Sequence, residues 1–339
     1  MSEFLFSYGL FMAKTITALI ALVFAVAIIA GSRKKEEDAE LRVTNLNDKY
    51  RDMKDRVTQS IMDKKEFKQL SKQLAKDLKK QQKSKIQDKP KPKLYVLEFD
   101  GDIRASEVET MRDEITALLS VAQPQDEVLL KLDNSGGIVH EHGLAASQLQ
   151  RIKNSKLNIT VVVDKVAASG GYMMACVADK VVAAPFSVIG SIGVIAQMPN
   201  FSRLLDKNGV DFEMIKAGEN KRTITMFGKN TDEDRAKFTE QVEDTHELFK
   251  DFIHEQRAAV DLTKVATGEH WYGRRALELN LIDELMTSDD YLWQLSAVAD
   301  IYEVSHIVPK SLSEKVMGSA QAAVDRVLTS AWQRSIFKA

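Results

Sequence analysis

The chain has 339 residues, enough for two domains or for one large domain with additional segments. Its 47 basic and 49 acidic residues nearly cancel, so the charge balance gives no support for nucleic acid as a partner. The single cysteine, Cys176, excludes an intrachain disulfide and a cysteine-rich zinc site, and we expect neither a metal nor a cofactor. Cys176 lies in an apolar stretch, so we expect a buried packing residue there rather than a nucleophile.

The N-terminal segment has the composition of a membrane anchor. Phe11–Gly31 contains 21 residues, of which only Lys14 is charged. A helix of that length spans roughly 31 Å, enough to cross the hydrocarbon core of a bilayer. The alternative is a cleaved secretory signal, because Ala25-Val26-Ala27 resembles a small-residue cleavage site. The basic residues at 33–35 directly follow and favour an uncleaved anchor over residues 1–32, with the lipid bilayer as a partner.

Residues 33–93 are rich in charged side chains and form a predicted linker. Apolar residues recur in it at the three- and four-residue spacing of an amphipathic helix, as at Leu46, Tyr50, Met53 and Val57. The pattern predicts a helical stalk or a partner-binding helix, and a solvated spacer is the alternative. Pro90 and Pro92 then mark a domain boundary.

Residues 94–300 alternate between strand-like and helix-like segments, which predicts a single α/β domain with a largely parallel, buried sheet. Strands are expected at Leu94–Phe99, Glu127–Leu132, Ile159–Val163, Lys180–Ala184 and Phe212–Lys216. Helices are expected at Val108–Val121, Leu144–Ile152, Tyr172–Ala178, Phe201–Asp206 and from Thr231 to about Ala259. Residues 301–339 are expected to form a helical extension, with an amphipathic helix at 313–337.

The most informative motif is Ala168-Ser169-Gly170-Gly171, between a strand and a helix. Small residues allow another backbone to approach Ser169, and the helix start offers free N–H groups. Such a turn can present a nucleophilic serine, and an ordinary turn with Ser169 as helix cap is the alternative. The turn Asp133–Gly137 has two glycines whose N–H groups could stabilise an oxyanion, or it is a generic connection.

No histidine lies in a recognisable triad pattern, and His140 and His142 are expected at the surface or as helix caps. A lysine whose pKa is lowered by burial is the other possible base for Ser169. Lys221, just after a predicted strand, is one candidate among many lysines.

Four strings in this order resemble protease IV, the signal peptide peptidase SppA family of serine peptidases with a Ser/Lys dyad. They are Asp133–Gly137, Ala168–Tyr172, Ile189–Val194 and Gly268–Gly273. The resemblance covers roughly residues 93–300, and the anchor and charged segment before one catalytic domain most resemble the SohB branch of that family.

The resemblance implies a role for each matching residue. Ser169 is the implied nucleophile, Lys221 the implied general base, and Ser191 the implied residue that orients the lysine. The implied oxyanion donors are the backbone N–H groups of Gly136 and Gly170. The sequence departs from the family pattern at Asn220, where relatives often have an aromatic residue, and at Ser135, where many have proline.

The family implies a ClpP/crotonase-like spiral fold and, because the domain occurs once here, a homo-oligomer. The expected function is a membrane-anchored serine endopeptidase that cleaves signal-peptide remnants or other unstructured polypeptides through an acyl-enzyme. Two alternatives are a catalytically degenerate membrane scaffold and a crotonase-type acyl-CoA enzyme. The expected location is the bacterial inner membrane, with one membrane span. The basic run at 33–35 favours a cytoplasmic catalytic domain, whereas the family favours the periplasmic side, which we adopt.

Overall fold

The computed structural model describes residues 7–12, 14, 15, 17, 40–63, 65–69, 72, 73, 76, 91–218 and 220–307. Residues 42–305 form one compact unit, and a second unit comprises residues 1–41 and 306–339. No helix in the described ranges is both long and apolar enough to cross a membrane. Most of the predicted anchor at 1–32 and the whole predicted helix at 313–337 lie outside these ranges, so both stay predictions.

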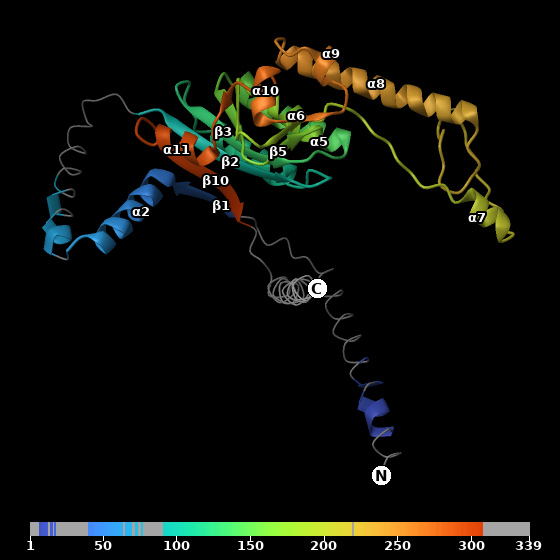
Figure 1. Ribbon diagram of the computed structural model, residues 1–339, viewed down its shortest axis with the longest axis horizontal. Coiled ribbons are helices and arrows are strands. Elements are labelled where there is room, and N and C mark those ends of the chain that lie inside the picture. The colour runs from blue at the N-terminus through green and yellow to red at the C-terminus, as the bar shows by residue number, and fades with distance from the viewer. Residues whose placement is uncertain are drawn as a thin grey trace, which may run out of the picture. The chain divides into compact units, whose positions relative to one another are not determined.

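The centre of the larger unit is a mixed α/β arrangement built on a twisted sheet (Figure 1). Its main path runs in the order β1, β10, β2, β3, β4, β6, β9. These strands are β1 Glu40–Asn45, β10 Asp300–Ile307, β2 Lys93–Gly101, β3 Glu127–Asn134, β4 Asn158–Val163, β6 Lys180–Ala183 and β9 Glu284–Leu285. All neighbours from β10 to β9 are parallel, which confirms the predicted parallel sheet.

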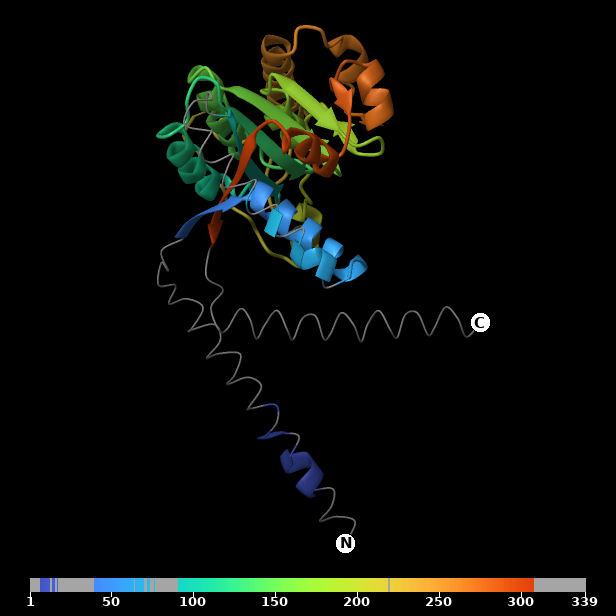
Figure 2. The same cartoon turned by 90° about the vertical axis from the view of Figure 1, so that its left-hand side faces the viewer.

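Helices cover both faces of this sheet because side chains alternate between the faces along each strand. Leu97 and Phe99 of β2 join one buried cluster, and Leu94 and Val96 join another. The first cluster includes residues of α4 Val108–Leu119, α5 Val139–Asn154, α6 Gly170–Ala175 and α8 Asp232–Gln256. The second includes residues of α2 Leu46–Ile61 and α11 Ser288–Leu295. Figure 2 shows α2 and α8 on opposite sides of the sheet.

The segments flanking the predicted catalytic domain contribute strands to its sheet. Residues 40–45, in the predicted stalk, form edge strand β1, and the following helix α2 buries Leu46 against the second cluster. Asn45 caps α2 by accepting a hydrogen bond from Asp48 N–H. Residues 300–307, at the start of the predicted helical extension, form β10 between β1 and β2.

Three further strands leave the main path and carry the site. They are β5 Val166–Ala168, β7 Val188–Gly190 and β8 His270–Tyr272. Strand β5 pairs with the end of β3 through Asn134 and Ala167, and it runs parallel to β7. Strand β8 then pairs with β7 in the antiparallel sense.

The segment between β7 and α8 runs out from the sheet alongside α8, with the short helix α7 Ser202–Lys207 beyond the far end of α8 (Figure 1). Helix α8 begins where the sequence predicts, and Thr231 and Asp234 form a capping box there. The predicted strand Phe212–Lys216 is wrong, because these residues have no strand structure. Phe212 and Met214 are instead exposed, at 43% and 40%.

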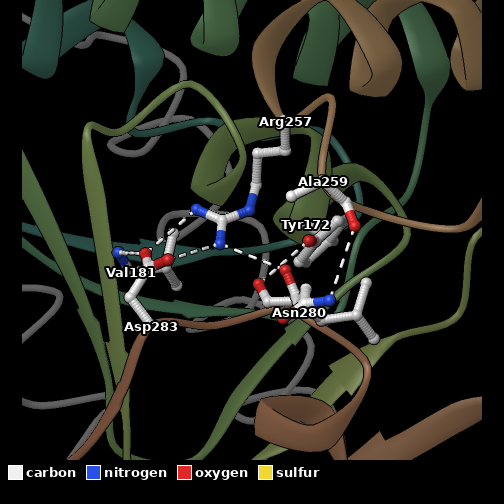
Figure 3. Close-up of polar contacts among 7 residues, drawn as sticks. Tyr172, Val181, Arg257, Ala259, Asn280 and Asp283 are labelled. Carbon is white, nitrogen blue, oxygen red and sulfur yellow. Dashed lines mark hydrogen bonds and ion pairs between the residues drawn. The ribbon is translucent and has the colours of Figure 1, made fainter.

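An ion pair fastens the end of α8 to the sheet (Figure 3). Arg257 donates hydrogen bonds of 2.8 and 3.0 Å to the two carboxylate oxygens of Asp283, which also accepts one from Val181 N–H of β6. Burial opposes ionisation of Asp283, but these hydrogen bonds outweigh it and hold its pKa below the usual value. Beside the pair, the buried Tyr172 hydroxyl donates to the carbonyl oxygen of Leu281.

Candidate active site

The parallel pair β5 and β7 brings two predicted site residues side by side. Ala168 is paired with Gly190, and Ser169 and Ser191 are the next residues of the two strands. Ser169 N–H donates to the carbonyl oxygen of Gly190 at 2.7 Å, and Ser191 N–H donates to that of Glu269 at 2.7 Å. The main chain therefore holds both serines at the ends of their strands.

Both serines have a backbone conformation that normally favours glycine. Ser169 has φ 52° and ψ −118°, and Ser191 has φ 50°. A residue with a Cβ is strained in this region, at about 1–3 kcal/mol, and such strain concentrates at functional sites. The sharp turn at Ser169 between β5 and α6 has the character of a nucleophile elbow, although the sequence lacks the Gly-x-Ser-x-Gly string.

A hollow of 550 Å³ lies over these residues. Ser169, Ser191, Gly136 and Gly137 line it, and so does His246 of α8. Ser191 Oγ donates a hydrogen bond of 3.4 Å to the carbonyl oxygen of Gly268, which also lines the hollow. The structure thus brings the predicted nucleophile, the predicted orienting serine and the glycine turn into one site.

The glycine turn packs tightly against Ser169. Gly136 has φ 85°, and a Cβ added to it would lie 2.7 Å from Gly170 N and 2.8 Å from Ser169 Cβ. The predicted oxyanion donor, Gly136 N–H, already donates to Oδ1 of Asn134 at 2.8 Å. Among the described residues, the N–H groups of Gly137 and Gly170 have no hydrogen-bond acceptor.

The predicted base lies in a different hollow. Lys221 is exposed and lines a hollow of 640 Å³ with apolar residues such as Met214 and Phe227, all in the segment between β7 and α8. Neither Ser169 nor Ser191 lines that hollow. Within one chain the structure does not bring Lys221 to Ser169.

The sequence did not predict the positions of two histidines at or near the site. His246 lines the hollow with Ser169, and its Nε2 is buried with no hydrogen-bond partner in the described part of the chain. The prediction that His142 lies at the surface or caps a helix is wrong, because its side chain is 0% exposed. His142 shares the inward face of α5 with Ala145 and Leu149, and that three- and four-residue spacing was the available signal.

Cys176 has the buried role that the sequence predicts. It lies in the main hydrophobic cluster just beyond α6. Burial raises the pKa of its thiol to about 12, against a smaller lowering by the charge of Arg257. A thiol with so high a pKa supplies almost no thiolate at neutral pH, so Cys176 does not compete with Ser169 as a nucleophile.

Comparison with known proteins identifies the class to which this fold and site belong. Residues 3–149 match the N-terminal region of peptidase family S49, and residues 151–301 match peptidase family S49 itself. The chain belongs to this peptidase family, which confirms the resemblance seen in the four motifs.

Several similar proteins carry the same name. The chain is 43% identical over 339 residues to "Probable protease SohB" of Haemophilus influenzae, with 97% of this chain and 96% of that protein covered. It is 46% identical over 301 residues to "Probable protease SohB" of Buchnera aphidicola subsp. Schlechtendalia chinensis, with 86% of this chain and 99% of that protein covered. A third protein of that name, from Buchnera aphidicola subsp. Acyrthosiphon pisum, is 46% identical over 319 residues, covering 93% and 94%.

Proposed function

We propose that this chain is a serine endopeptidase in which Ser169 is the nucleophile. The observation that carries the proposal is the strained backbone of Ser169, fixed at the end of β5 in a hollow it shares with a glycine turn. Ser169 Oγ would attack the substrate carbonyl carbon while a base removes its proton. The proton would then pass to the leaving amine, and water would hydrolyse the resulting ester to release the acid and restore Ser169.

The oxyanion donors would come from the glycine turn and the start of α6. Gly170 N–H directly follows the nucleophile and has no acceptor within the described residues. Gly136 was the predicted second donor, but its N–H is already bound by Asn134. Gly137 lines the same hollow and its N–H is free of such a bond, so Gly137 is the donor we propose from this turn.

We propose that Lys221 is the general base and reaches Ser169 of a second copy of the chain. Within one chain Lys221 and Ser169 line separate hollows, and this separation supports the arrangement. The segment that carries Lys221 also exposes apolar side chains, including Ile215 at 99% and Phe212 at 43%, which a second copy would bury. Ser191, beside Ser169, would orient the incoming lysine, and the active protein would be a homo-oligomer.

A complementation experiment tests the dyad and its arrangement. Ser169→Ala and Lys221→Ala should each abolish peptide hydrolysis in an otherwise folded protein. When the two inactive chains are co-expressed, activity should return to roughly a quarter of the sites, those that combine an intact serine with a neighbour's intact lysine. Full absence of recovery, with mixed oligomers demonstrated, would place serine and base in one chain.

His246 is the other candidate base, because its ring shares the hollow of Ser169. His246→Gln keeps a polar side chain of similar reach and cannot act as a base. If Lys221→Ala retained wild-type turnover while His246→Gln lost it, a serine–histidine pair would replace the proposed dyad. Loss in Lys221→Ala alone would support the lysine.

We further propose that the fold is of the ClpP/crotonase-like spiral type, with strands β5, β7 and β8 as the layer that leaves the main sheet. Residues 1–32 would anchor the chain in the bacterial inner membrane, with the catalytic domain on the periplasmic side. Protease accessibility in spheroplasts tests the side: digestion from outside supports the periplasm, and protection until lysis contradicts it.

The proposed substrates are signal-peptide remnants and other unstructured polypeptides. The hollow over Ser169 is lined in part by the apolar residues Val194, Ile195 and Ala266, which supports this class because such a hollow suits extended chains with apolar side chains. A serine-directed fluorophosphonate probe separates the peptidase from its two alternatives. Labelling that is lost in Ser169→Ala supports the peptidase, whereas a folded protein without labelling would favour a degenerate scaffold or an acyl-CoA enzyme.

A further inference from the structure

His142 is a buried polar side chain next to the site that the proposed chemistry does not use. It lies in the first turn of α5 and is 0% exposed. A buried polar group without hydrogen bonds costs stability, so its partners show why it is kept there. Its Nδ1 lies 3.0 Å from the carbonyl oxygen of Ile138, and its Nε2 lies 3.2 Å from Oδ1 of Asn134. Both of these neighbours are acceptors, and a neutral imidazole has only one N–H to donate.

The contact with Asn134 has a defined direction. Gly136 N–H donates to the same Oδ1 at 2.8 Å, and a backbone N–H can only donate. The side-chain oxygen of Asn134 is therefore the atom that faces the turn, while its Nδ2 lies 3.3 Å from Sδ of Met174. The Ile138 carbonyl already accepts from the main-chain N–H of His142 at 3.1 Å, so we assign the ring hydrogen to Nε2, which donates it to Asn134.

Asn134 has little freedom to respond if this hydrogen bond is lost. It is 1% exposed, and a Cβ added to Gly101 would lie 2.4 Å from its Cγ. Its backbone oxygen is equally enclosed, since a Cβ added to Gly171 would lie 2.1 Å from it. His142 is thus part of a closely packed hydrogen-bond network that continues through Asn134 to Gly136 N–H. Through this network His142 is connected to the glycine turn of the site.

The His142 ring also lies against Gly170. A Cβ added to Gly170 would be 2.4 Å from Cγ of His142, so the ring occupies the space beside the Gly170 main chain. Gly170 follows the proposed nucleophile and supplies a proposed oxyanion donor. His142 therefore contacts Gly170 directly and reaches the Gly136–Gly137 turn through Asn134.

We propose that His142 is a positioning residue for the oxyanion site. It touches no substrate; it sets the separation of Gly137 N–H and Gly170 N–H by holding the segment beneath each of them. The inference rests on the proposed serine-peptidase function. Because an oxyanion site acts on the transition state more than on the bound substrate, misplacing its donors should lower kcat with little effect on KM.

Three variants of His142 separate positioning from simple packing. Leucine fills much of the space and donates nothing. Glutamine places an amide N–H near the position of Nε2 and can still reach Asn134. Asparagine is one methylene shorter, so its amide lies near Nδ1 and does not reach Asn134.

We expect His142→Leu and His142→Asn to lower kcat on the order of 10- to 100-fold, with KM within about threefold of wild type. His142→Gln should recover most of the lost kcat. Affinity for a peptidyl boronate, whose tetrahedral adduct with Ser169 places an oxygen at the oxyanion site, should fall in parallel with kcat. Thermal unfolding of each variant reports the folded fraction.

Wild-type kcat in His142→Leu or His142→Asn would overturn the proposal. So would equal losses in the glutamine and asparagine variants, or failure of all three to fold, since either result assigns His142 a purely structural role. If only leucine fails to fold, the glutamine–asparagine pair decides. Ser169→Ala tests the proposed function separately: hydrolysis retained in that variant rejects the serine mechanism whatever the His142 variants show.

Discussion

Replacing Ser169 by glycine should give a more stable protein than replacing it by alanine, although both variants lose the hydroxyl that we propose as the nucleophile. The reason is the backbone of Ser169, at φ 52° and ψ −118°, where a Cβ is strained and glycine is not. Serine and alanine both carry a Cβ, so both keep the strain. The alanine variant therefore removes the hydroxyl alone, and the glycine variant removes the hydroxyl and the strain.

The size of the difference follows from two opposing contributions. Relief of the strain stabilises the glycine variant by about 1–3 kcal/mol. Glycine gains more conformational entropy in the unfolded chain, which costs about 0.5–1 kcal/mol. Taken at the midpoints of these ranges, the net advantage of Ser169→Gly over Ser169→Ala is about 1 kcal/mol, or roughly 2–4 °C in Tm for a domain of this size.

Thermal unfolding of the two variants, followed by circular dichroism or calorimetry, measures this difference. Ser147 provides the control, because it lies exposed within helix α5 at ordinary helical geometry. There the order should reverse, with Ser147→Ala more stable than Ser147→Gly by about 1 kcal/mol. A Ser169→Ala protein as stable as Ser169→Gly, with the control behaving as expected, would refute the claim that the turn at Ser169 stores strain.

Four further predictions concern other parts of the chain. Arg257→Met should lower the free energy of unfolding, measured with urea, by about 2–3 kcal/mol. The loss is smaller than for a fully buried pair because Asp283 is 38% exposed. Because the pKa of Asp283 is lowered in the folded protein, its carboxylate contributes stability above about pH 4, and this contribution is lost as the pH falls through the folded pKa. The free energy of unfolding of Asp283→Asn should therefore fall less steeply with decreasing pH than that of the wild type. Ser191→Ala should lower kcat roughly 10- to 1000-fold; an unchanged kcat would leave Ser191 structural. Deletion of residues 1–31 should release a still oligomeric protein from membranes, and a monomer in light scattering would contradict assembly through the catalytic domain.

The main sheet was predictable because the burial of its strands determines which residues they contain. The run Ile159–Val163 is apolar on both sides of the strand, as a strand covered on both faces must be, and it forms most of β4. Phe212–Lys216 contains three apolar residues but has no strand structure, and Ile215 is 99% exposed. A strand needs a neighbour to complete its hydrogen bonds, and the pattern of one segment does not reveal whether a neighbour exists.

The tight turn at Ser169 was predictable for a different reason. Ser169 lies between residues whose small size is required locally, since a Cβ added to Gly136 or Gly171 would collide with backbone atoms. Such requirements appear in the sequence as strings of alanine and glycine. His142 left no such trace, because its role depends on Asn134 of another element, eight residues away in the chain and in contact only after folding.

The position of Lys221, the proposed base, could not be predicted from the sequence. A serine at a strand end is placed by the few residues around it, whereas a lysine on a long side chain is placed by whatever the whole segment packs against. The segment that bears Lys221 runs out along α8 (Figure 1) and keeps large apolar side chains exposed, so nothing within one chain fixes the lysine beside Ser169. A desolvated amine is what a lysine base needs, and desolvation at an exposed position must come from a second surface. The activity of this site is therefore expected to depend on assembly, and the complementation of Ser169→Ala by Lys221→Ala measures that dependence directly.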